Sequence, residues 1–356
     1  MSGFFEKMLR VITQIAFLFV MLIVVLLAFG YIYLFKSTLN SYTYEQPKLI
    51  KVHRGTSYMD IVRELYKNEI IKEKFSFKVL GALMPEARKI KPGRYYVPSG
   101  LTSAELLRFL YTRHQDETRV RIPEGSSGKE VAMALDGCVD FDTTSFMQAF
   151  RDKALTKELG VEAANFEGYL LPDTYNFHWS STAEDVIRVL VKEFRTFYND
   201  SLQTAARKAG LTELEVLTLA SIVEAETSLN SERPVVASVY LNRLHKGMAL
   251  QADPTVIYAL GGERRRLLFR DLKCDSPYNT YLYQGLPPGP IGNPSRESIL
   301  AVLFPKKTNY IYFVATGNGG HNFSQTLEEH YANVQMYRTV MEQKKAEKLA
   351  LQDSTR

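Results

Sequence analysis

Two glutamates at the end of an apolar segment, Glu224 and Glu226, are the residues best placed for acid–base chemistry. The sequence predicts a helix over residues 214–227 that is apolar nearly all round between 216 and 223, so we expect it in the centre of a domain. A carboxyl at the end of such a helix is partly desolvated. Because desolvation disfavours the charged form, its pKa rises and it can donate a proton near neutral pH.

The same two glutamates also allow a structural interpretation. Side chains two positions apart point about 200° apart around a helix, so one can face a cleft while the other supports the fold. A glutamate at a helix end can also pair with a base such as Arg233 or Arg243. Helix geometry does not decide which glutamate has which role.

The elements around this helix carry clear boundary signals. A helical pattern over 182–208 is ended by Gly210, and an aromatic-rich extended segment over 166–177 precedes it. Thr212 and Glu215 predict a capping box at the start of the glutamate-bearing helix. A further helix is predicted over 232–246.

Other polar residues near these elements are candidates for support or substrate binding. A predicted loop follows Gly247, and its Asp-Pro pair either shapes a cleft or caps a turn. The tyrosine and asparagine at 278–279 precede a rigid segment rich in glycine and proline, and the histidine at 321 follows two glycines. The full set of candidates is Glu224, Gln251, Asp253, Thr255, Tyr278, Asn279, Glu167, Asp173 and His321.

The N-terminal region predicts a membrane anchor. Residues 11–35 contain no charge, and about 20 apolar residues suffice to cross a bilayer. The run is too long for the core of a signal peptide, and no small-residue cleavage pattern follows it. Lys7 and Arg10 precede the run, so we expect residues 1–10 in the cytoplasm and the rest of the chain outside it, in the periplasm if the membrane is an inner one.

A weak repeat follows a polar linker at 36–47. Three stretches, beginning near residues 49, 94 and 120, each predict a strand that ends at a glycine and a helix that begins at Ser or Thr. Thr102 and Glu105 predict a capping box in the second of them. A second helix pattern over 73–83 gives the first stretch a strand–helix–helix–strand order that resembles a LysM glycan-binding module. Ordinary packing explains the same order.

Composition excludes some functions. The net charge of +5 is mild, and no stripe of Lys and Arg indicates nucleic-acid binding. The six histidines form no metal-binding cluster with the cysteines, so we expect no metal or cofactor. Cys138 and Cys274 are far apart in sequence, and an oxidising compartment permits but does not require a bridge between them.

Ordered blocks across residues 165–330 resemble the endolytic murein transglycosylase (YceG-like) family. They include Ala220-Ser-Ile-Val-Glu-Ala-Glu-Thr227, Ala237-Ser-Val-Tyr-Leu-Asn-Arg243, Leu250-Gln-Ala-Asp-Pro-Thr-Val-Ile-Tyr258, Glu167-Gly-Tyr-Leu-Leu-Pro-Asp-Thr-Tyr175 and Gly319-Gly-His-Asn-Phe323. The anchor and the LysM-like region match the N-terminal plan of that family.

The resemblance implies a reaction and a residue for it. It implies an internal, non-hydrolytic cut between MurNAc and GlcNAc of nascent peptidoglycan that leaves 1,6-anhydro-MurNAc ends. It places the acid and base at Glu226, which is followed by Thr227 as in lytic transglycosylases at large, with Glu224 as the fallback. Expected partners are glycan strands, the membrane and peptidoglycan synthases. A hydrolytic muramidase and a non-catalytic wall-binding scaffold are the alternatives.

Together these patterns predict an α+β protein with a transmembrane helix, small LysM-like α/β modules and a mixed, helix-rich catalytic domain. The predicted boundaries are a tail at 1–10, the transmembrane helix at 11–35, a linker at 36–47 and the repeat region at 48–135. The catalytic domain is predicted at 136–340 and a charged tail at 341–356.

Overall fold

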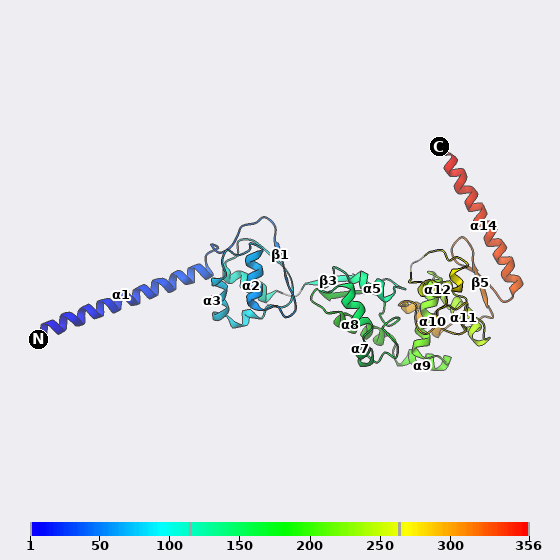
Figure 1. Ribbon diagram of the computed structural model, residues 1–356, viewed down its shortest axis with the longest axis horizontal. Helices are drawn as coiled ribbons and strands as arrows, with labels where there is room; N and C mark the ends of the chain where they lie inside the picture. Colours follow the sequence, from blue (N-terminus) through cyan, green and yellow to red (C-terminus); the bar gives the residue numbers. More distant parts are fainter. Residues whose placement is uncertain (1, 114–115, 263–264, 355–356) are drawn as a thin grey trace. The chain divides into compact units, whose positions relative to one another are not determined.

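The computed structural model describes residues 2–113, 116–262 and 265–354, which form two compact units (Figure 1). The first unit comprises the chain up to Thr118 together with His178–Ser180. The second comprises Arg119–Phe177 and the chain from Ser181 onward. The predicted α+β class is confirmed, because helices dominate and the strands of the described residues form three two-stranded sheets.

The N-terminal helix α1 (Ser2–Phe35) opens the first unit. Within its stretch Gly3–Phe35, the most apolar 18-residue window has a mean hydropathy of 3.0, and in the described part of the chain this helix alone is long and apolar enough to cross a membrane. At about 1.5 Å per residue, its length exceeds the hydrocarbon core of a bilayer. The helix also includes residues 2–10 of the predicted tail.

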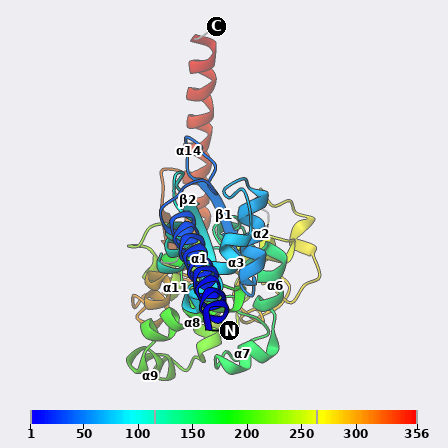
Figure 2. The ribbon, with the colours of Figure 1, turned by 90° about the vertical axis from the view of Figure 1, so that its left-hand side faces the viewer.

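The rest of the first unit is a small α/β body. Strand β1 (Lys48–Val52) pairs antiparallel with β2 (Gly93–Val97), and Figure 2 shows the two side by side. Helices α2 (Tyr58–Lys67), α3 (Phe75–Leu83) and α4 (Ser103–Thr112), with the 3-10 turn η1 (Pro85–Arg88), complete it. Leu65, Phe77 and Leu106 are among the fully buried residues of its core.

The three predicted strand–turn–helix stretches are confirmed. Their helices begin at the N-caps Ser57, Thr102 and Ser127, whose hydroxyls accept hydrogen bonds from backbone amides of the first turn. The glycines in the turns, at 55, 100 and 125, have φ values of +82°, +80° and +71°. Residues with a side chain rarely adopt that conformation, which explains why each turn between strand and helix contains a glycine.

The second unit is built mostly from helices. Its elements begin with β3 (Glu117–Arg121), α5 (Gly128–Leu135), α6 (Thr143–Phe150), α7 (Lys153–Glu158), β4 (Thr174–His178), α8 (Ala183–Phe197), α9 (Asp200–Ala209) and α10 (Glu213–Glu226). They continue with α11 (Arg233–His245), α12 (Asp253–Ala259), η2 (Asp271–Lys273), α13 (Arg296–Leu303), β5 (Tyr312–Ala315), β6 (His321–Ser324) and α14 (Leu327–Ser354). Strand β3 pairs with β4, and β5 pairs antiparallel with β6.

Helix α10 lies at the centre of this unit. All residues from 216 to 223 are buried, as the sequence predicted, and the helix packs against α11 and α13. The predicted capping box at Thr212 and Glu215 is present, and Gly210 has φ of +71° at the end of α9. The helix that positions the two glutamates is therefore fixed along its length.

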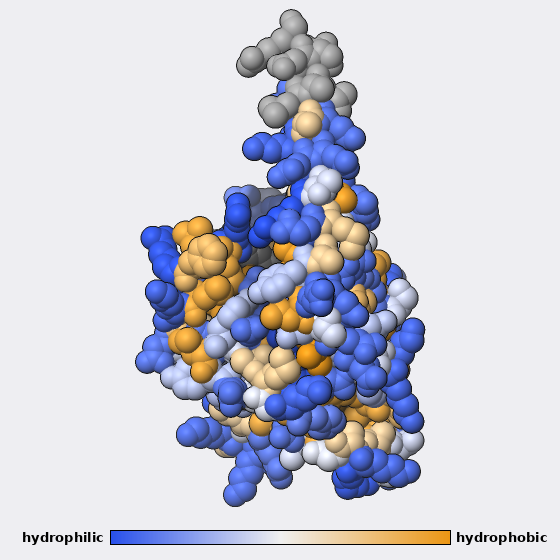
Figure 3. All heavy atoms as spheres, turned by 90° about the vertical axis from the view of Figure 1, so that its right-hand side faces the viewer, coloured by the Kyte–Doolittle hydropathy of each residue, from blue (hydrophilic) through white to orange (hydrophobic). Residues whose placement is uncertain are grey.

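The final helix, α14, has a different surface. Its first half packs against β5 and β6, and the remainder projects with mostly hydrophilic side chains, as Figure 3 shows. The charged tail predicted at 341–356 is, over its described part, the end of this helix.

Three local predictions need correction. The helix predicted over 182–208 is two helices, because the chain breaks at Tyr198 and Asn199 caps α9. The loop predicted around Asp253 is largely the short helix α12. The extended segment predicted over 166–177 is strand only from Thr174 onward, and turns precede it.

The predicted domain boundary after residue 135 stays a prediction. In the structure, Val120, Ile122, Val131 and Leu135 belong to the core of the second unit. The cysteines at 138 and 274 are both free.

Candidate active site

The two glutamates at the end of α10 have different surroundings. Glu224 pairs with Arg233 of α11, whose Nη2 lies 2.7 Å from its Oε1. Its other oxygen accepts hydrogen bonds from the backbone amide of Ser295, at 2.9 Å, and from the hydroxyl of the same residue. Both side chains of the ion pair are less than a tenth exposed. Glu224 is thus a buried, fully paired carboxylate.

Among the described residues, Glu226 has a single hydrogen-bond partner, and its side chain lines two cavities. The hydroxyl of Tyr240 donates to its Oε1 at 2.6 Å. Burial raises the pKa of Glu226 to about 7; the hydrogen bond from Tyr240 favours the charged form, and the nearby charge of Asp253 adds to the rise. A carboxyl with this pKa is populated in both protonation states near neutral pH, as a group that donates and later accepts a proton must be.

Tyr240 is held firmly in place. It is 1% exposed, and its ring packs edge-on against Phe313, with 5.8 Å between ring centroids. Burial raises the pKa of Tyr240 well above its usual value, so the phenol keeps its proton and donates to Glu226.

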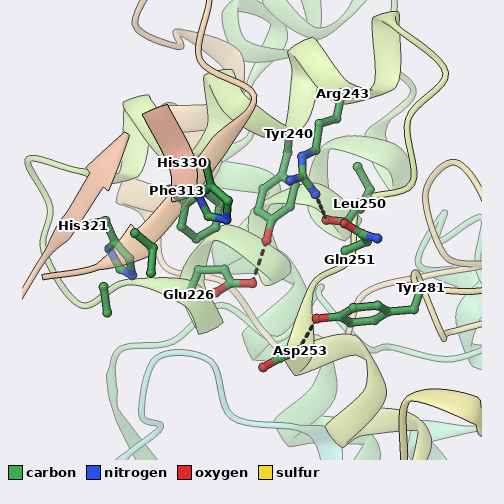
Figure 4. Close-up of a pocket in the computed structure, with 12 residues that line it drawn as sticks. Glu226, Tyr240, Arg243, Leu250, Gln251, Asp253, Tyr281, Phe313, His321 and His330 are labelled. Atoms are coloured by element: carbon green, nitrogen blue, oxygen red, sulfur yellow. Dashed lines mark hydrogen bonds between the residues drawn. The ribbon is translucent and has the colours of Figure 1, made fainter. Parts of the chain in front are cut away.

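One cavity next to Glu226 has a volume of about 340 Å³ (Figure 4). Its polar lining includes an exposed carboxylate, Asp253, whose Oδ1 accepts a 2.6 Å hydrogen bond from the hydroxyl of Tyr281. The lining residues are Glu226, Tyr240, Arg243, Leu250, Gln251, Asp253, Tyr281, Phe313, Val314, Ala315, His321 and His330.

A second cavity, of about 420 Å³, is lined by Glu226 as well. Thr227, Ile257 and Tyr258 line it, and the carboxyls of Glu124 and Glu224 contribute to it. Glu226 is the residue of α10 that lines both cavities, so an extended ligand occupying the two would pass its carboxyl.

The segment around Gln251, for which the sequence allowed either a cleft-shaping role or a capped turn, lies at the first cavity. Gln251 has a positive φ of 49°, which a side chain other than glycine rarely adopts, and its amide donates to the carbonyl of Thr280 at 3.1 Å. Thr255, by contrast, is fully buried and bonds to the carbonyl of Ala252 at 2.7 Å, so it supports the segment and contacts no cavity.

The residues predicted at 278–279 lie behind the site. Asn279 is fully buried and donates to the carbonyls of Leu272 and Cys274, at 3.0 and 2.8 Å. Tyr278 packs against Tyr258, with 4.9 Å between ring centroids. Both hold the wall of the site without lining either cavity next to Glu226.

The other two candidate carboxylates are outside the site. Asp173 is exposed and pairs with Arg296 at 2.8 Å. Glu167 is 6% exposed and accepts a 2.9 Å hydrogen bond from the amide of Gly128. Burial raises the pKa of Glu167 to about 8. Neither residue lines a cavity with Glu226.

Some residues of the site, such as Tyr240 and His330, carried no predicted role, and Arg243 was predicted only as a base that could pair with a glutamate. Tyr240 lies within a quoted sequence block, and Arg243, three residues on and so on the same face of α11, donates to the carbonyls of Ile311 and Leu250, both at 2.7 Å. His330 reaches the first cavity from α14. The three-residue spacing of Tyr240 and Arg243 was the sequence signal that could have identified these two residues.

The helix-rich fold and the cavity beside Glu226, a glutamate at the end of a helix, define the class of protein to which this chain belongs. The family model of the YceG-like family matches residues 50–336, so the chain belongs to that family and the predicted family is confirmed. The resemblance of the first unit to LysM stays a prediction.

Relatives and a solved structure agree with this class. A protein named endolytic murein transglycosylase from Bacillus subtilis is 32% identical over 297 residues, 79% of this chain and 82% of that protein. A protein of the same name from Streptococcus pneumoniae serotype 2 is 29% identical over 344 residues, 86% of this chain, which spans 61% of that longer relative. A crystal structure of a yceG-like protein from Listeria monocytogenes is 31% identical, with a TM-score of 0.56, and the match covers 80% of this chain and 98% of that one.

Proposed function

We propose that this chain is a membrane-anchored endolytic transglycosylase that cuts peptidoglycan glycan strands with Glu226 as both acid and base. The observation that carries the proposal is the state of that carboxyl. It is half-buried, has a pKa raised to about 7, and lines two adjoining cavities in a family whose relatives bear this activity as their name.

The chemistry follows from one carboxyl in two protonation states. Protonated Glu226 donates its proton to the oxygen between MurNAc and GlcNAc while the bond to C1 breaks. The resulting carboxylate then takes the proton of the muramyl C6 hydroxyl as that oxygen attacks C1 of its own ring. The nucleophile is tethered to the ring, so proximity lowers the barrier. The product carries a 1,6-anhydro-MurNAc end, and the carboxyl regains its proton.

The two cavities support an internal cut. A strand that lay through both would present sugars on either side of Glu226, as a cut away from the strand end requires. The hydrogen bond from Tyr240 keeps the carboxyl oriented between them. Asn279 and Thr255 act in this account as support for the cavity wall.

The anchor sets where the cut takes place. Helix α1 has the length and hydropathy of a membrane span, and the basic residues 7 and 10 favour a cytoplasmic N-terminus. We therefore place the catalytic unit outside the cytoplasm at the cell (inner) membrane, where nascent strands and their synthases are found.

The first unit is a candidate for a second glycan contact. A groove of about 360 Å³ runs beside β1 and α2, and His53, Thr56, Asp60 and Glu64 supply polar groups to it. Polar groups that converge in a groove of this size suit a sugar. This assignment extends the LysM-like prediction.

A hydrolytic muramidase is the second candidate, and Asp253 is the observation that favours it. Two carboxyls in one cavity, Glu226 and Asp253, are the equipment of a glycosidase that activates water or forms a covalent intermediate. The third possibility, a wall-binding scaffold, needs neither carboxyl.

The deciding experiment is digestion of purified glycan strands by the full chain in detergent, followed by mass spectrometry of the ends. Anhydro-muramyl ends are expected. Reducing muramyl ends would support the muramidase, and uncut strands the scaffold. Glu226→Gln should cut strands at least about a hundredfold more slowly than the wild type, while the matched control Glu158→Gln, at an exposed pair with Arg188, must cut as the wild type does.

A further inference from the structure

The carboxylate of Glu232 joins two segments of the site. It accepts hydrogen bonds from the backbone amide of His321 and from its ring Nδ1, both at 2.8 Å, and from the hydroxyl of Thr227 at 3.2 Å. Thr227 is the residue after Glu226, and His321 is the first residue of β6. Glu232 therefore ties the end of the glutamate-bearing helix to the strand that carries the imidazole.

The charge of Glu232 fixes where the imidazole carries its proton. Burial raises the pKa of Glu232, but the hydrogen bonds and charge of His321 outweigh burial and hold it below its usual value. An ionised carboxylate only accepts, so Nδ1 must carry the hydrogen. In a neutral ring Nε2 then has a free lone pair and accepts a hydrogen bond.

The ring is also fixed in orientation. It packs edge-on against Phe313, with 5.3 Å between centroids, and lies 6.3 Å from the ring of Phe323. Within the described ranges, Nε2 makes no hydrogen bond, and His321 lines the same cavity as Glu226 (Figure 4).

The backbone at Gly320 lies close to the carboxylate of Glu232. A Cβ at this position would lie 2.6 Å from Oε1 of Glu232, and the residue has a φ of +83°. A side chain here would displace the carboxylate from the amide and ring of His321, so glycine is required for the contact.

From these contacts we propose that Glu232 and His321 form a dyad in which Nε2 of the imidazole accepts a hydrogen bond from a sugar hydroxyl of the bound glycan. His321 would be a catalytic residue, because it contacts substrate, and Glu232 a positioning residue. The inference rests on the proposed function, since its ligand is the strand that Glu226 cuts.

The tautomer is tested by nitrogen-15 NMR of the full chain in detergent micelles, in mildly alkaline buffer. The wild type is expected to show Nε2 of His321 as the unprotonated nitrogen. Glu232→Gln offers an amide donor to Nδ1, so the proton should move to Nε2 and the two nitrogen shifts should exchange. A wild-type ring protonated at Nε2 would overturn the dyad.

Kinetics test the contact with substrate. His321→Ala and Glu232→Gln should each lower kcat/KM for glycan strands by roughly ten- to hundredfold, because a substrate hydroxyl loses its acceptor. The matched control is His245→Ala, at an exposed position in the last turn of α11, and it should cut at the wild-type rate.

The outcomes separate the two proposals. If the wild type cuts strands and His321→Ala cuts equally well, the dyad is wrong and the proposed function stands. If the wild type cuts nothing, the proposed function fails, and the NMR result still decides the tautomer.

Discussion

Glu224 and Glu226 lie two residues apart on one helix, yet Glu224 is surrounded by hydrogen-bond donors, whereas Glu226 lies beside cavities. Glu224 receives Arg233 and two donors from Ser295. Glu226 receives one phenol and lines two cavities. The difference shows that two glutamates close in sequence can differ in their ability to donate a proton, because their surroundings in the fold differ. A carboxylate with several hydrogen-bond and ion-pair partners stabilises the fold, whereas a carboxyl with few partners can donate its proton.

The largest expected effect is loss of activity on one side of this comparison. Glu226→Gln should reduce the rate of strand cleavage by about 10²- to 10⁴-fold, because it removes the proton donor and leaves the shape of the side chain unchanged. Initial rates and far-UV circular dichroism on the same samples check this. A folded variant with the wild-type rate would remove Glu226 from the mechanism.

The next largest expected effect is a loss of stability when Glu224 is replaced. Glu224→Ala should lower the free energy of unfolding by about 3–5 kcal/mol, because the buried charge of Arg233 would keep, among the described carboxylates, only its 3.4 Å contact with Glu124, whose side chain is 54% exposed. Denaturant unfolding measures it. Combining Glu224→Leu with Arg233→Met removes both charges and should recover much of the loss. A Glu224→Ala variant as stable as wild type would break the comparison.

A smaller effect is a pH-dependent stability difference at Glu226. Its pKa is about 7 in the folded protein and near 4.5 without the fold, so the folded state binds the proton more tightly. Stability from this group is present below about 4.5 and is lost as pH rises through about 7. Glu226→Gln should therefore become more stable than wild type by about 1–3 kcal/mol in mildly alkaline buffer. Thermal unfolding at several pH values decides this, and a difference that is independent of pH would contradict it.

The smallest effect sharpens the role of Tyr240. Its hydroxyl stabilises the charged form of Glu226, so Tyr240→Phe should raise the pKa of that carboxyl by about one unit. Because cleavage needs the protonated acid, the alkaline limb of the pH–rate profile should move to higher pH by the same amount. A limb that stays in place, or moves to lower pH, would show that this hydrogen bond does not set the pKa.

Local signals explain what the sequence predicted correctly. The burial of α10 and its capping box follow from residues within one helix. The turns follow from single glycines that adopt positive φ values. The break between α8 and α9 was missed because the apolar spacing continues across it, while Asn199 caps the second helix. Signals of this kind extend over a few residues, so they define elements better than they define sites.

Long-range contacts explain the remainder. The bond from Tyr240 to Glu226 spans 14 residues, and that from His321 to Glu232 spans 89. No periodicity in one sequence places such partners together. The choice between the two glutamates came from family resemblance, and the structure adds the physical difference between them.

The most direct test of the central claim is a carbon-13 NMR titration of the glutamate carboxyls in the full chain. The wild type should show a carboxyl resonance that titrates near pH 7 and is missing from Glu226→Gln, while the resonance of Glu167, whose pKa burial raises to about 8, should remain in the variant. If that resonance titrates near the ordinary glutamate value of about 4.3, Glu226 is not held as an acid near neutral pH, and the account is contradicted.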